Sequence, residues 1–184
     1  IRHAPPFAAP EFYGAHSPWL VTIPGCPADT PVTSACRVVF FSWADTYHSF
    51  DPGNLDYRAW MTARLMAQAL RDHPARGIFL DVHAPTYAKV GLYTTAVLSG
   101  GMLREYGLRA QAPAIDALYG PDLVASLTAH RDALNAIDKF LIINCAGWSL
   151  DPGCKEQELA AGGMHTEGLF TPSLQPWQMD ELIA

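Results

Sequence analysis

Short, mostly apolar runs separated by helical patterns constrain the fold of this chain most strongly. Four runs read as buried strands: 37–43 (RVVFFSW), 77–82 (GIFLDV), 140–145 (FLIINC) and 163–170 (GMHTEGLF). They lack the regular polar–apolar alternation of a strand with one solvated face. A shorter run at 19–23 indicates a fifth strand. Strands covered on both faces are typical of a parallel sheet packed between helices.

Helical patterns lie between these runs. Asn54 or Asp56 can cap a helix that reaches Leu70, because apolar residues recur four positions apart on one face. Further helices are expected at 92–106 and at about 122–137. The alternation predicts an α/β protein, a (β/α) barrel over residues 18–184 preceded by an arm or loop at 1–17. With 184 residues against the usual ~250, the barrel would be incomplete or abbreviated. An open doubly wound sheet is the alternative.

Composition excludes several classes of partner. The net charge is −6 and no basic stripe occurs, which argues against a nucleic-acid partner. No apolar stretch reaches the ~18 residues of a membrane span, so no membrane partner is expected. No G-x-G-x-x-G motif or phosphate-cradling loop follows a strand, so we expect no cofactor.

The four cysteines fall into two close pairs, Cys26 with Cys36 and Cys145 with Cys154. Four cysteines allow three pairings, and the local one would close two short loops. We predict these two disulfides in a secreted or otherwise extracytoplasmic protein, in which the start at Ile1 rather than Met reflects a missing or removed upstream segment. The alternative is four reduced thiols, with Cys145 buried as an ordinary free cysteine after its strand.

Polar side chains end the strong strands, where parallel α/β proteins gather their function. The run at 77–82 ends in Asp81, with His83 two residues later, and the run at 140–145 offers Asn144. His165 and Glu167 lie two apart in the last run. A charge at the end of an apolar strand is costly unless it is paired or used. Asp81 and Glu167 are therefore the predicted catalytic pair, although either could instead cap a helix or pair with an arginine.

Other polar and aromatic residues fill the predicted substrate-binding set. The strand at 37–43 offers Ser42 and is followed by Asp45 and His48. His83 and His165 suit a structural or substrate-contacting role better than a catalytic one. Aromatic rings can stack on sugar faces, although core packing is the commoner role of any one of them, Trp19 included. The predicted substrate-binding residues are Trp43, Tyr47, His83, Asn144, Trp148 and His165.

The motifs resemble, in their order, a group of barrel glycosyl hydrolases that includes relatives of the α-1,4-polygalactosaminidases. They are 17–20 (SPWL), 50–58 (FDPGNLDYR), 77–81 (GIFLD), 140–144 (FLIIN) and 163–168 (GMHTEG). The resemblance implies Asp81 as nucleophile, Glu167 as general acid/base and Asn144 as a sugar-binding neighbour, in a retaining glycosidase. His83 and the loop 147–162 depart from the family pattern and leave the substrate open.

Chemistry argued from the residues alone agrees with that assignment, because glycoside cleavage needs one protonated and one ionised carboxyl group. Two rival functions stay open. Asp81, His83, His165 and Glu167 could instead hold a metal ion in a metal-dependent hydrolase. The chain could also be a non-catalytic carbohydrate-binding or assembly protein on a barrel scaffold.

Overall fold

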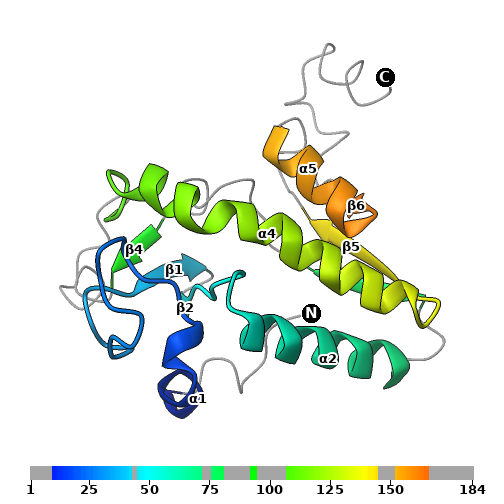
Figure 1. Cartoon of the computed structure of the whole chain (residues 1–184), viewed down its shortest axis with the longest axis horizontal. Helices are drawn as coiled ribbons and strands as arrows, with labels where there is room; N and C mark the ends of the chain where they lie inside the picture. The colour runs from blue at the N-terminus through cyan, green and yellow to red at the C-terminus, as the bar shows by residue number, and fades with distance from the viewer. Residues whose placement is uncertain are drawn as a thin grey trace. The chain divides into compact units, whose positions relative to one another are not determined.

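The computed structural model describes residues 10–42, 45–71, 76–80, 92–94, 107–144 and 152–165 (Figure 1). The chain divides into two compact units, which are described separately. Unit 1 comprises Ile1–Ala59 and Thr86–Leu123, and unit 2 comprises Trp60–Pro85 and Val124–Ala184. The elements are α1 (Pro10–Ala15), η1 (Ser17–Trp19), β1 (Val38–Ser42), β2 (Asp45–His48), α2 (Leu55–Arg71), β3 (Gly77–Leu80), β4 (Leu92–Thr94), α4 (Ala112–Asn135), β5 (Phe140–Asn144), α5 (Pro152–Ala161) and β6 (Met164–His165).

Unit 1 contains an antiparallel sheet in the order β2-β1-β4. Val38 and Val39 are consecutive residues of the central strand and both are fully buried, so both faces of β1 are covered. Val38 belongs to the core cluster of this unit. Two apolar residues four positions apart on α4 pack in the same cluster. Its buried members are Val21, Val38, Leu108, Ile115 and Tyr119.

Unit 2 contains a parallel sheet in the order β3-β5-β6. Its buried apolar residues alternate along the strands, with Ile78 and Leu80 on β3 and Leu141 and Ile143 on β5. The helix α5 lies between β5 and β6 in the sequence and so provides the crossover that a parallel connection requires.

The expectation of a (β/α) barrel is wrong. A barrel needs about eight parallel strands, whereas the described part of the chain has six, divided between one antiparallel and one parallel sheet. The error arose at the run 37–43, whose continuous apolar character indicates burial on both faces but not the direction of its neighbours. That run forms β1, which pairs antiparallel with β2, a strand that was not predicted from the sequence.

The local elements follow the sequence more closely. The expected helix to Leu70 is confirmed as α2, and the runs at 77–82 and 140–145 are confirmed as β3 and β5. The helix expected from about residue 122 begins at Ala112 and continues through Pro121, which costs it one backbone hydrogen bond. Residues 92–94, expected in a helix, form β4, and α1 lies within the expected N-terminal arm. Among the helices that the structure describes, none is long and apolar enough to cross a membrane.

Gly77 is required by the close approach of β3 to β5. A Cβ at this position would lie 2.4 Å from the carbonyl oxygen of Phe140, a backbone atom that cannot rotate away. We expect Gly77→Ala to reduce the free energy of unfolding by about 1–3 kcal/mol, measured by urea denaturation. Gly14→Ala in α1 is the control, because apart from its chain neighbours and its own helix no atom lies within 4 Å of its Cβ position. As a helical substitution it should be neutral or stabilising, and equal losses in both variants would contradict the prediction.

Candidate functional site

The described strands of unit 2 end together at one edge of the parallel sheet. Leu80, Ile143 and Met164 are in register across the three strands, and one residue further Asn144 pairs with His165. Parallel strands direct their carboxyl ends to the same edge, which is where open α/β sheets bind ligands. Two residues predicted from the sequence, Asn144 and His165, are therefore neighbours on adjacent strands at this edge of the sheet.

Asn144 is the predicted residue at this edge whose burial the structure describes. It ends β5 and is only 3% exposed, although its side chain is polar. Asp81 follows Leu80 directly in the sequence, and Glu167 comes two residues after His165. Both carboxylates lie outside the described residues, as do Trp43, His83 and Trp148. The shared cleft of Asp81 and Glu167 therefore stays a prediction.

Tyr47 belongs to another sheet. It lies in β2 of unit 1, opposite Phe40 of β1, whereas Asn144 and His165 lie in the parallel sheet of unit 2. Trp19 is also in unit 1, where its ring stacks on His16 with centroids 3.9 Å apart. Trp19 is only partly buried, so core packing, the expected role of any one of these aromatic rings, stays a prediction for it.

A pair of carboxylates in unit 1 was not singled out from the sequence. A Cβ on Gly53 would lie 2.5 Å from Oδ2 of Asp122 and 3.2 Å from Oδ1 of Asp51, so both carboxyl groups approach the same point. The guanidinium Nη2 of Arg58 lies 3.8 Å from Oδ1 of Asp122. Burial raises the pKa of Asp51 above its ordinary value, the backbone N–H of Gly53 opposes that shift, and the charge of Asp122 adds to it.

Local structure accounts for Asp51 without a ligand. Its Oδ1 accepts a hydrogen bond of 2.8 Å from the N–H of Gly53, two residues on, which is the pattern of an Asx turn. The next residue, Asn54, accepts a bond from the N–H of Tyr57 and so caps α2, as predicted. The sequence Asp-Pro-Gly-Asn signals this turn and cap, but not the approach of Asp122 from a distant segment.

A buried histidine in unit 2 was also missed. His130 accepts or donates at both ring nitrogens, with Nδ1 2.8 Å from the hydroxyl of Thr62 and Nε2 3.2 Å from that of Ser126. Ser126 and His130 are each 4% exposed, so this Ser–His pair has no surface for a substrate. The cluster connects α2 and α4 by polar contacts. Within the described ranges no group of three or more His, Cys, Asp or Glu side chains could hold a metal ion.

His48 gives unit 1 a dependence on pH. Burial, followed by the positive charge of Arg37, lowers the pKa of His48 to about 4 from its ordinary 6.5. As the pH falls below 6.5, the unfolded chain therefore binds a proton that the folded protein does not. We expect the free energy of unfolding to fall by on the order of 2 kcal/mol between pH 7 and pH 4, allowing for partial exposure of the ring. Urea denaturation at several pH values measures the loss, and His48→Asn should flatten the profile. An unchanged profile would contradict the assignment to His48.

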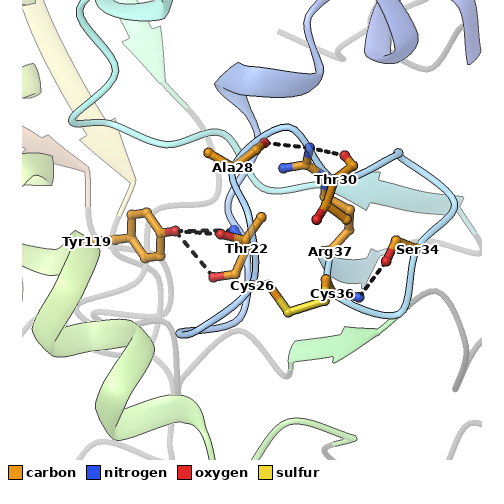
Figure 2. The surroundings of a disulfide bond; sticks show 8 residues. All are labelled: Thr22, Cys26, Ala28, Thr30, Ser34, Cys36, Arg37 and Tyr119. Atoms are coloured by element: carbon orange, nitrogen blue, oxygen red, sulfur yellow. Dashed lines mark hydrogen bonds between the residues drawn. A yellow bond between two sulfur atoms is a disulfide. The ribbon is translucent and has the colours of Figure 1, made fainter.

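The predicted disulfide between Cys26 and Cys36 is confirmed, with an S–S distance of 2.03 Å (Figure 2). Cys154 is disulfide-bonded as well. Its predicted partner, Cys145, lies outside the described residues, so that pairing stays a prediction.

Arg37 lies next to the first disulfide and is completely buried. Its guanidinium donates hydrogen bonds to the carbonyl oxygens of Leu20, Ala28 and Thr30 and to the hydroxyl of Ser17. We refer to these four oxygens as the Arg37 cage. Burial lowers the pKa of Arg37, while the nearby Tyr119 and Asp29 act in the opposite direction.

Tyr119 connects α4 to Thr22, which forms an isolated β-bridge with Arg37. Its hydroxyl accepts a hydrogen bond from the N–H of Thr22 and donates one to the carbonyl oxygen of the same residue, each at 3.2 Å (Figure 2). The sequence signals neither Arg37 nor Tyr119 as structural, because no local pattern marks the oxygens around Arg37, and Tyr119 is 97 residues from Thr22.

The resemblance to barrel glycosyl hydrolases stays a prediction that rests on short motifs. No family model matches this chain, and comparisons with curated proteins and with solved structures also give no match.

Proposed function

We propose that this protein is a glycoside hydrolase that uses Asp81 and Glu167 as its pair of catalytic carboxylates. The observation that supports the proposal is the register of the parallel sheet in unit 2. The strand that precedes Asp81 and the strand that precedes Glu167 flank β5 and end at the same edge. A barrel is not needed for such a site, because open parallel sheets also bind ligands at the carboxyl ends of their strands.

The proposed roles follow from the chemistry of glycoside cleavage. One carboxyl group must protonate the leaving oxygen, a role proposed for Glu167, while Asp81 in its ionised form attacks the anomeric carbon or activates water. Asn144 ends the strand between them and is proposed to hydrogen bond a sugar hydroxyl group.

The spacing of the strands bears on stereochemistry. The strands β3 and β6 are two strand steps apart, about 9.6 Å at the usual spacing. Inverting enzymes separate their carboxyl groups by ~6.5–9.5 Å and retaining enzymes by ~5–5.5 Å. Retention, which the family resemblance implies, therefore requires the two side chains to converge across β5.

The proposed location is extracytoplasmic. The Cys26–Cys36 disulfide supports it, because such bonds persist in oxidising compartments and are rare in the cytosol. A polysaccharide or oligosaccharide outside the cytoplasm is therefore the proposed substrate class.

A screen of polysaccharides and oligosaccharides with detection of new reducing ends tests the proposal. We expect hydrolysis of at least one glycan, unaffected by a chelator. Activity that a chelator abolishes and Zn²⁺ or Mn²⁺ restores would instead support the metal-dependent hydrolase. Binding on a glycan array without any release of reducing ends would support a carbohydrate-binding protein. Either result contradicts the two-carboxylate mechanism.

A further inference from the structure

We propose that the Cys26–Cys36 disulfide is a redox-sensitive lock on the buried Arg37, and that a dithiol reductant opens it. The proposal concerns unit 1 and is independent of the proposed hydrolase activity. It rests on the position of the Arg37 cage relative to the disulfide; Figure 2 shows Arg37 with the disulfide and with Ala28 and Thr30, the two members of the cage from inside the loop.

The segment between the two cysteines has almost no core of its own. From Pro24 to Cys36 only Thr30 is buried, and the backbone makes local turns rather than strands or helices. Such a segment gains little from the hydrophobic effect, which is the main force that orders a chain. Its order therefore depends on its closure by the disulfide, on its contacts with Arg37 and on the hydrogen bond that the Ser17 hydroxyl donates to the carbonyl oxygen of Thr30.

The oxygens of the Arg37 cage come from both inside and outside the loop that the disulfide closes. Ala28 and Thr30 supply two of its oxygens from inside the closed loop, and Ser17 and Leu20 supply the other two from outside it. Without the covalent closure the loop regains conformational freedom, and its two carbonyl groups can leave the guanidinium. A charge that loses half of its acceptors in a buried site must become hydrated, which requires local opening.

Loss of the Arg37 cage would also weaken backbone pairing that involves the core of unit 1. Ile23 donates a backbone hydrogen bond to Cys36, and Val38 donates one to Val21, on either side of the buried Arg37. Val21 and Val38 are members of the core cluster. Loosening this pairing therefore frees the start of β1 as well as the loop.

A reductant can reach the bond, because Cys26 and Cys36 are both partly exposed and most of the loop between them is exposed. A thiolate of the dithiol attacks one sulfur, forming a mixed disulfide and releasing the other cysteine. The second thiol of the reductant then displaces the remaining cysteine. The protein gains two electrons and two protons, and the reductant leaves as a disulfide.

Tryptic cleavage of the Arg37–Val38 bond is the readout, since trypsin cuts after arginine only where the backbone opens. In the oxidised protein we expect this bond to be protected. In dithiothreitol under native conditions, cleavage should accelerate at least about tenfold relative to cleavage at the exposed Arg71. Reoxidation with oxidised glutathione should restore protection. Mass spectrometry identifies the cut, and alkylation maps which cysteines were reduced.

The double variant Cys26→Ser/Cys36→Ser is the control that separates this bond from the disulfide of Cys154. It should be cleaved at Arg37 without reductant and should not respond to dithiothreitol. If the variant does not fold, partial reduction of the unmodified protein decides the question, because alkylation identifies the molecules in which Cys26 and Cys36 are reduced and Cys154 is not. Equal cleavage rates in oxidised and reduced protein, protection that does not return, or a native bond that dithiothreitol leaves intact would each overturn the proposal.

Discussion

Asp81→Asn should lower glycan hydrolysis by at least about ten-thousandfold while leaving glycan binding and the free energy of unfolding little changed. Asparagine is nearly the same size as aspartate, but its amide is a poor nucleophile and a poor base. The loss should appear in kcat rather than in KM, because the carboxylate acts mainly in the transition state. Steady-state kinetics with reducing-end detection measure it on the first glycan that the screen identifies.

Two further variants make this result interpretable. Glu167→Gln should cost about 10²–10⁴-fold on natural glycans but much less on substrates whose leaving group needs no proton. Asp138→Asn is the matched control, because Asp138 is exposed and has φ 56°, a conformation that asparagine also adopts readily. It should leave activity unchanged. Full activity of Asp81→Asn would exclude Asp81 from the mechanism.

The first-formed anomer decides the role of Asp81 once a substrate is known. A retained configuration, detected by NMR of the fresh product, requires a covalent glycosyl intermediate and therefore a nucleophile. An inverted product would recast Asp81 as a base acting on water, which agrees with the wide spacing of β3 and β6.

Arg37→Met should be among the most destabilising single substitutions in unit 1, with a loss of about 2–4 kcal/mol in the free energy of unfolding, because buried acceptors lose their donor. Methionine fills much of the volume of arginine, but it donates no hydrogen bonds. The substitution would remove the side-chain donor of the carbonyl oxygen of Leu20, and it would leave the carbonyl oxygen of Thr30 with the Ser17 hydroxyl alone. Urea denaturation followed by far-UV circular dichroism measures the loss.

Arg37→Lys should be intermediate, because one ammonium group can donate three bonds but cannot span the positions that the planar guanidinium reaches. Arg71→Met is the control, since Arg71 is exposed at the end of α2 and such changes usually stay within about 0.5 kcal/mol. A loss for Arg37→Met no larger than that of the control would show that the cage contributes little to stability.

The candidate site was predictable to the extent that it depends on strand ends. The run 140–145 placed Asn144 at the end of a buried strand, and the structure confirms it at the end of β5. Its neighbour in the ladder, His165, could not be predicted as such, because strand order is a property of the folded sheet. Polar clusters such as Thr62 with Ser126 and His130, or Asp51 with Asp122, join residues far apart in the chain, and no local pattern signals them.

The sequence by itself determined the features whose causes are local. The helix α2 follows from a capping Asn54 and a four-residue apolar repeat, and the Cys26–Cys36 bond follows from two cysteines in one short, turn-rich segment. Only the tertiary structure decided that 37–43 and 45–48 pair antiparallel, that 77–82 and 140–145 pair parallel, and that Arg37 is buried. The physical reason is that an apolar run indicates that its surface must be buried, but burial has no direction. Contacts between distant segments determine which partner covers the run.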